Sequence, residues 1–239
     1  MKKFSHIPWL LIVNAILLIG VAIICTAGNK AVNTAAEHVA HGKRKTIIID
    51  AGHGGIDGGA TSCTGVLESK INLEIALRLD DLFHLLGIPT QMIRKTDSSI
   101  YTQGDTIAAQ KVSDLKNRVS IINNTENSIV ISIHQNYFQS SKYAGAQVFY
   151  GPAEGSEELA KSLQETLVTT INKGSKRKTK KANGIYLMEH IRRPGILLEC
   201  GFLSNPEEEH KLRSKEYQKN LCCVMASVCA NYLNHKMLS

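Results

Sequence analysis

The sequence predicts an α/β fold, a single domain with a mainly parallel central sheet and helices on both faces, preceded by an N-terminal apolar helix. Three observations support this prediction. Short apolar runs such as "KTIIID", "SIVISIH" and "GILLECG" alternate with amphipathic segments. Such near-continuous apolar strands are typical of parallel sheets that are covered on both faces. The 239 residues, of which 43% are hydrophobic and 21% charged, suit one globular core.

The N-terminal segment reads as a signal peptide or a signal anchor over residues 1–27. Lys2 and Lys3 precede an uncharged apolar run of nineteen residues, 7–25. This run is long for the apolar part of a cleaved signal and just long enough to cross a bilayer. The small residues in "CTAG" would permit cleavage, so both alternatives stay open. The lysines are expected in the cytoplasm and the rest of the chain outside it, with residues 28–44 as a linker.

The catalytic domain is expected at residues 45–239, and it begins with a strand at residues 45–50. A helix follows at 68–86, because one apolar stripe recurs at helical spacing in Ile71, Ile75, Leu79, Leu82 and Leu86. A short strand is predicted at 89–94 and a helix at 112–124.

Four more strands are predicted, at residues 128–134, 145–151, 184–188 and 195–201. Helices are predicted at 157–171 and at about 214–234. Between the last strand and the last helix, Asn205 is expected to cap a helix that Pro206 opens.

The formal net charge of +7 is a local feature. Residues 173–181, "KGSKRKTKK", hold six cations and no acid, and without them the charge is near +1. A solvated loop explains such a run, and attraction to an anionic polymer or a membrane surface is the functional alternative. Aromatic residues are sparse and no nucleic-acid-binding motif is present, so nucleic acid is not an expected partner. The six cysteines contain no CxxC pair, which argues against a zinc ribbon.

Polar residues end three of the predicted strands: His53, His134 and Glu199. The carboxyl ends of parallel strands share one rim, where ligands bind in such sheets, and Glu68 opens a helix near the same rim. Two histidines and a carboxylate form a common catalytic zinc set, and a second carboxylate can take a proton from water. Each residue alone also has a structural explanation, as a hydrogen-bonded turn residue or a helix N-terminal acid.

Two other chemistries are disfavoured. The glycines do not form GxGxxG, because Asp57 occupies the third place, so dinucleotide binding is not expected. Cys200 could be a nucleophile with His134 as its base. However, Cys200 and Glu199 are adjacent in a strand and point to opposite faces, so both cannot easily serve one site.

Four motifs in order, "DAGHGGIDGGA", "GVLESKINLEIALRL", "SIHQN" and "LLECGFLSNPEE", resemble the zinc-dependent N-acetylmuramoyl-L-alanine amidases of the amidase-3 family. The resemblance covers about residues 45–235 and looks greatest to the short spore-cortex members. It implies one Zn²⁺ per chain, bound by His53, Glu68 and His134, with Glu199 as general base and later proton donor. It also implies cleavage of the amide between N-acetylmuramic acid and L-alanine of the stem peptide in peptidoglycan, as one step toward muramic-δ-lactam in cortex formation.

Supporting roles are expected for two further residues. Asp50 would orient the His53 loop, and Asn136 would fix the turn after His134. Arg118 is interpreted as structural, while Gln135 and Cys200 depart from the residues that many relatives carry beside the site.

The resemblance also implies an extracytoplasmic enzyme, in the space around a forespore, with the membrane as a partner through the N-terminal segment. An activating spore-envelope protein is a further expected partner. Two alternatives stay open: a peptidoglycan-binding protein with an inactive site, and a zinc peptidase.

Overall fold

The computed structural model describes residues 45–238, except for the side chains of residues 236–238. Residues 45–239 form one compact unit by their own contacts. The predicted signal segment and linker lie outside the described residues. None of the helices in the described part is long and apolar enough to cross a membrane.

The central sheet has six strands in the order β2-β1-β3-β6-β4-β5. Four of them are parallel, with β1 paired to both β2 and β3, and β3 paired to β6. Only the pairing of β4 with β6 is antiparallel, and β5 is parallel to β4. The mainly parallel sheet is therefore confirmed. The strands are β1 (Thr46–Ala51), β2 (Thr90–Met92), β3 (Ser128–Asn136), β4 (Gln147–Tyr150), β5 (Lys180–Lys181) and β6 (Gly195–Phe202).

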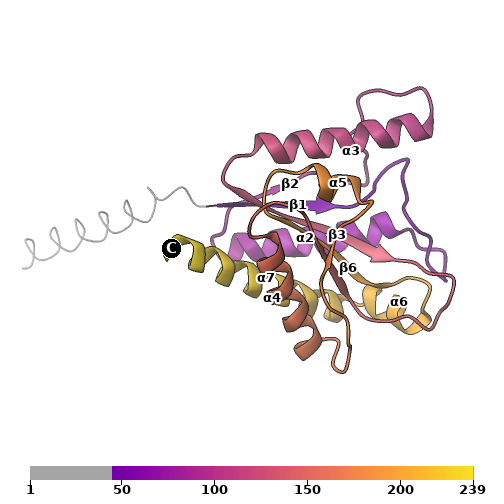
Figure 1. Ribbon diagram of the computed structural model, residues 1–239. Helices are drawn as coiled ribbons and strands as arrows, with labels where there is room; N and C mark the ends of the chain where they lie inside the picture. Colours follow the sequence, from indigo (N-terminus) through magenta and orange to yellow (C-terminus); the bar gives the residue numbers. More distant parts are fainter. Residues whose placement is uncertain (1–44, 239) are drawn as a thin grey trace, which may run out of the picture. The chain divides into compact units, whose positions relative to one another are not determined.

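Helices cover both faces of the sheet (Figure 1). On one face lie α2 (Glu68–Leu85), α4 (Ser156–Thr170) and α7 (Lys215–Leu238). On the other face lie α3 (Ile107–Asn124) and α5 (Tyr186–His190), and α6 (Pro206–Arg213) follows the end of β6. We call these the α2 face and the α3 face. The division follows from strand alternation, since Ile129, Ile131 and Ile133 of β3 pack into the larger core and Val130 into the smaller one.

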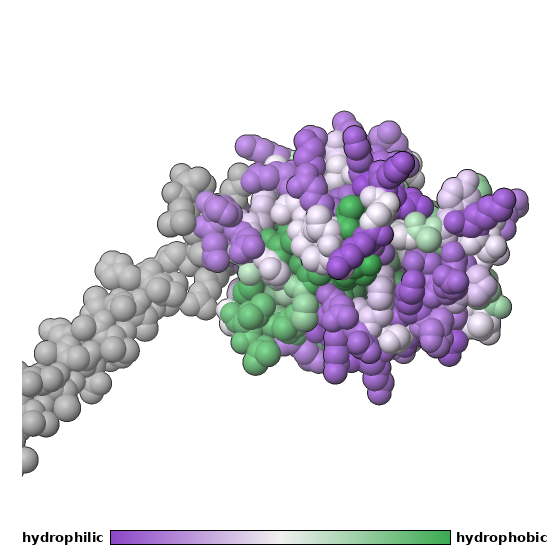
Figure 2. Space-filling view, turned by 90° about the horizontal axis from the view of Figure 1, so that it is seen from below, coloured by the Kyte–Doolittle hydropathy of each residue, from purple (hydrophilic) through white to green (hydrophobic). Residues whose placement is uncertain are grey.

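One side of the molecule is mostly hydrophilic. On the side of the molecule that faces downward in Figure 1, hydrophobic side chains gather in one area and hydrophilic ones cover most of the rest (Figure 2). Isolated exposed hydrophobic side chains are normal for a globular domain.

Two local predictions need correction and one is confirmed. Residues 184–188 do not form a strand, because the short helix α5 occupies this region and the edge strand β5 precedes it at Lys180–Lys181. Helix α3 begins at Ile107, five residues before the predicted start, since the Thr106 side chain accepts a hydrogen bond from the backbone N–H of Ala109. Asn205 caps α6 as predicted, with Pro206 in the first turn.

Candidate metal centre

The loop after β1 carries His53 in a left-handed backbone conformation, with φ 62°. Glycine at position 52 is required by close packing, since a Cβ there would lie 2.2 Å from the His134 ring. The glycine-rich turn thus packs its backbone against the His134 imidazole and also positions the His53 imidazole. This explains why a histidine stands among glycines at the end of an apolar strand.

Three predicted site residues come together at the carboxyl edge of the sheet. Nitrogen or oxygen atoms of His53, Glu68 and His134 all lie within 4.8 Å of one another. Nε2 of His53 lies 3.3 Å from Oε1 of Glu68, and Nδ1 of His134 lies 3.0 Å from the same oxygen. Loop, helix and strand each contribute one side chain.

The carboxylate of Glu68 is almost fully buried and held from several directions. Its Oε2 accepts a hydrogen bond from the Ala60 N–H, and its Oε1 accepts one from the Gln135 N–H, each at 3.0 Å. The Asn72 side-chain amide donates to Oε1 at 3.2 Å. Burial opposes the charge, but the hydrogen bonds from both histidines outweigh it and hold the pKa of Glu68 well below its usual range.

Asp57 orients His53, a role that the sequence did not reveal. Its Oδ2 lies 2.8 Å from His53 Nδ1, and its Oδ1 lies 2.7 Å from Lys111 Nζ. Burial lowers the pKa of the His53 imidazole, but hydrogen bonds to Asp57 and Glu68 outweigh this effect and raise the pKa to about 9. A carboxylate on one ring nitrogen fixes the tautomer and leaves the other nitrogen for a metal.

Glu199 lies beside this cluster on β6, as the register partner of His134. Its Oε2 is buried and has no hydrogen-bond partner among the described residues. Burial raises the pKa of Glu199 to about 7, and the charge of Glu68 adds to that rise against the opposing effect of the histidines. A carboxyl group with such a pKa can accept and release a proton near neutral pH.

Asp50 and Asn136, the predicted supporting residues, have different surroundings. Asp50 accepts hydrogen bonds from Arg118 at 2.5 Å and from Ser132 Oγ at 2.6 Å. Arg118 in turn donates to the backbone carbonyl of His53 at 2.8 Å, so Asp50 reaches the loop through this arginine. Asn136 accepts a hydrogen bond from the Leu203 N–H through its backbone carbonyl, which ties the end of β3 to the residue after β6.

Two more buried residues support the site. Arg94 donates to the backbone carbonyls of Ala51 and Gly52, at 2.8 and 3.0 Å, and so holds the β1 end from a second side. Asn72 lies four residues after Glu68 on α2, a spacing that places both side chains on one helix face. This spacing is a signal in the sequence from which a supporting role of Asn72 could be predicted. For Asp57 and Arg94 the sequence offers no such periodic signal.

Cys200 is fully buried in the larger core, on the α2 face. Burial raises the pKa of its thiol well above the ordinary value. A neutral thiol on the face of β6 opposite to Glu199 is no nucleophile for this site, in agreement with the strand-alternation argument.

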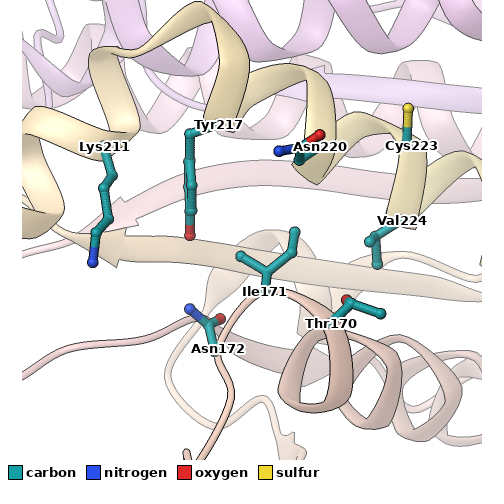
Figure 3. Close-up of a pocket in the computed structure, with 8 residues that line it drawn as sticks. All are labelled: Thr170, Ile171, Asn172, Lys211, Tyr217, Asn220, Cys223 and Val224. Atoms are coloured by element: carbon teal, nitrogen blue, oxygen red, sulfur yellow. The ribbon is translucent and has the colours of Figure 1, made fainter.

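A cavity of about 320 Å³ adjoins the cluster on the α3 face. Its lining includes His53, His134, Lys111, Tyr186 and Leu197. A larger cavity of about 560 Å³ lies elsewhere, where Tyr217 of α7 points toward the loop at Asn172 after α4 (Figure 3). It contains none of the clustered residues.

Comparisons with known proteins agree with this architecture. The family model described as N-acetylmuramoyl-L-alanine amidase, amidase-3, matches residues 47–227. The chain is 38% identical over 194 residues to the germination-specific N-acetylmuramoyl-L-alanine amidase of Bacillus subtilis, covering 80% of this chain and 81% of that protein.

Two solved amidase structures are also similar to this chain. The CwlD amidase from Clostridioides difficile, in complex with the GerS lipoprotein, is similar with a TM-score of 0.76 and 40% identity, covering 80% of this chain and 98% of that one. An N-acetylmuramoyl-L-alanine amidase from Clostridium difficile 630 is similar with a TM-score of 0.69 and 30% identity, covering 80% and 97%.

Proposed function

Because this chain belongs to the amidase-3 family of N-acetylmuramoyl-L-alanine amidases, we propose that it is a zinc-dependent hydrolase of spore-cortex peptidoglycan. It cleaves the amide between the lactyl group of N-acetylmuramic acid and L-alanine of the stem peptide. The observation that carries the proposal is the convergence of two imidazoles and a buried carboxylate beside a second carboxyl group that lacks a partner among the described residues.

The residues fit a zinc ion. His53, Glu68 and His134 offer the nitrogen and oxygen donors of a catalytic site with three protein ligands and one open position. The partners of Glu68 and the Asp57 contact to His53 hold these donors in place. When bound, zinc supplies Lewis acidity that polarises the scissile carbonyl.

Glu199 moves the protons of the reaction. The carboxylate accepts a proton from the attacking water, whose oxygen forms the new bond to the carbonyl carbon. It then gives that proton to the L-alanine nitrogen as the carbon–nitrogen bond breaks. A pKa of about 7 suits both steps, and Oε2, which has no partner in the described part of the chain, can accept the proton.

The names of two relatives support a proposal on the place of action. The Bacillus subtilis relative is named germination-specific, and the C. difficile CwlD structure is of a complex with a lipoprotein. We therefore propose action outside the cytoplasm around the forespore, toward muramic-δ-lactam in the cortex, with membrane attachment through the N-terminal segment and an activating envelope lipoprotein.

The test is identification of the amino termini that the zinc-loaded chain releases from purified peptidoglycan. New N-terminal L-alanine, absent with a chelator and absent with Glu199→Gln that still binds zinc, is the expected result. A different new terminus identifies a peptidase. Tight peptidoglycan binding without cleavage, with zinc and a lipoprotein partner present, identifies a binding protein.

A further inference from the structure

We propose that the basic segment, residues 173–181, binds free carboxylates of the substrate's stem peptide and so sets the side on which that peptide lies. The inference rests on the proposed amidase function and adds a binding site to it. Three structural observations carry it: the position of the segment, its anchor and its unpaired charge.

The segment lies two strands away from Glu199. In the antiparallel pair of β4 and β6, Gln147 is the register partner of Glu199. The side-chain amide of Gln147 donates a hydrogen bond to the backbone carbonyl of Lys178 on its other side. Two strand spacings amount to about 10 Å, so a lysine side chain at position 178 comes within reach of a substrate held at Glu199.

Strand pairing places Lys180 on the face of the sheet that carries Glu199. Lys180 pairs with Phe149, and Phe149 pairs with Leu197, two residues before Glu199 on the same strand. Register partners share a face and so do residues two apart, so Lys180 lies on the α3 face. Lys181 lies on the α2 face, and Lys178 precedes the strand, where its backbone carbonyl contacts the Gln147 side chain.

Arg177 anchors the segment against the strand ends. Its Nε donates to the backbone carbonyl of Ala144 at 2.9 Å, and its Nη1 donates to the side-chain oxygen of Gln147 at 3.2 Å. Its guanidinium lies 4.8 Å from the centre of the Phe202 ring, where β6 ends. One cation is therefore used to hold the segment, and the others are left for binding.

The five lysines of the segment are uncompensated. They are exposed, and none forms an ion pair with a residue in the described part of the chain. They are Lys173, Lys176, Lys178, Lys180 and Lys181. Their charge is therefore available to an anionic ligand.

The substrate's chemistry assigns the ligand. The lactyl carboxyl of each substituted muramic acid is consumed in the amide, so that glycan unit is neutral. Free carboxylates occur only on the stem peptide, beyond L-alanine. An extended peptide advances about 3.4 Å per residue, so acidic residues after alanine reach about 7 to 10 Å from the scissile bond. That distance matches the position of the basic segment.

Lysines on an edge strand also have a plainer use, because they discourage pairing with another chain. That explanation covers Lys180 and Lys181 in β5. It does not explain the cations outside the strand or an arginine that fixes the segment beside Gln147.

The test uses the zinc-loaded full-length chain and two soluble glycan-strand substrates. One has free stem-peptide carboxylates, and the other has the same carboxylates amidated with ammonia. The variant Lys178→Gln/Lys180→Gln is compared with Lys215→Gln/Lys219→Gln, which removes the same charge from exposed positions of α7, outside the basic segment. KM and kcat come from L-alanine amino termini released, and Kd comes from binding of fluorescently labelled strands.

On the free-carboxylate strands we expect Lys178→Gln/Lys180→Gln to raise KM and Kd about three- to tenfold, with kcat within about twofold of wild type. The control pair should stay near wild type. On amidated strands the wild type should bind as weakly as the variant. An unchanged KM and Kd, or an equal rise on both substrates, would overturn the assignment, as would charge-dependent binding to anionic phospholipid vesicles with unchanged Kd for the strands.

The same data separate failure of the proposed function from failure of this inference. If wild type released no L-alanine termini but bound the strands in a carboxylate- and lysine-dependent way, the amidase proposal would fail and the binding site would stand. If wild type cleaved the strands and neither lysine mattered, the binding site would fail and the amidase proposal would stand.

Discussion

Asp50 and Arg118 form a buried ion pair beneath the candidate metal centre, with Oδ1 of Asp50 2.5 Å from Nη1 of Arg118 and side-chain exposures of 1% and 2%. The same guanidinium contacts Asp114 and the His53 carbonyl. One arginine thus joins helix α3, strand β1 and the loop that presents His53. Its structural interpretation from the sequence agrees with these contacts.

Arg118→Leu should destabilise the protein strongly, because it leaves the charge of Asp50 buried without a partner. Breaking such a pair typically costs about 3–5 kcal/mol. Lys161→Leu is the control, since Lys161 pairs with Glu157 where both side chains are more than half exposed, and such a pair contributes little to stability. Free energies of unfolding from urea titrations check both variants, and equal losses would contradict the buried-pair argument.

The stability that Asp50 provides should depend on pH in one direction. Burial opposes its charge, but Arg118 and Ser132 outweigh that and hold the pKa of Asp50 below the ordinary value of 3.8. The contribution is therefore complete above pH 3.8 and is lost as the pH falls through the lower folded-state pKa. The difference in unfolding free energy between wild type and Asp50→Asn should be constant from pH 7 to about 5 and shrink below 3.8. A difference that grows on acidification would refute this assignment.

Gly52→Ala should abolish zinc binding and activity. Its new methyl group would lie 2.2 Å from the His134 ring, which leaves no room for the imidazole in its present position. Gly58→Ala is the control, because its Cβ would meet only the end of the Leu67 side chain at 3.0 Å, which can move. Zinc per chain, measured by elemental analysis alongside circular dichroism, tests the pair. Full zinc occupancy in Gly52→Ala would exclude His134 as a ligand.

Asp57→Asn should weaken zinc binding about 10- to 100-fold, because it removes the carboxylate that orients His53. Asp97→Asn provides the comparison, since Asp97 also contacts this loop, at the Gly55 N–H, without touching a proposed ligand. Competition with a fluorescent zinc chelator gives both affinities. Matching affinities for the two variants would mean that Asp57 does not position His53.

The convergence of the site was predictable because parallel strands place their carboxyl ends on one edge. His53 and His134 end neighbouring strands, and Glu199 is the direct register partner of His134. Glu68 was predictable only as a helix N-terminal acid near that edge. Its contacts to the backbone of residues 60 and 135 depend on how loops pack, which no periodicity encodes.

The segment between β4 and β6 shows the limit of prediction from hydrophobic patterns. "GIYLM" is a five-residue stretch, mostly apolar, and too short for its period to separate a strand from a helix. Its last three residues begin α5, and Lys180 and Lys181 form the edge of the sheet instead. This edge position of β5 also brings the basic segment beside Gln147, which the sequence alone could not indicate.

The side chain of Glu68 joins its own helix to the loop after β1 and to the end of β3, whereas Glu199 keeps an oxygen with no partner among the described residues. Replacement of the two acids during evolution should therefore have different structural costs. A descendant that no longer cleaves peptidoglycan and only binds the wall can replace Glu199 with little change in its fold. Replacement of Glu68 would unsettle the β1 loop and the end of β3 at once. Inactive descendants of this lineage should thus be recognisable by a changed position 199 beside a retained position 68.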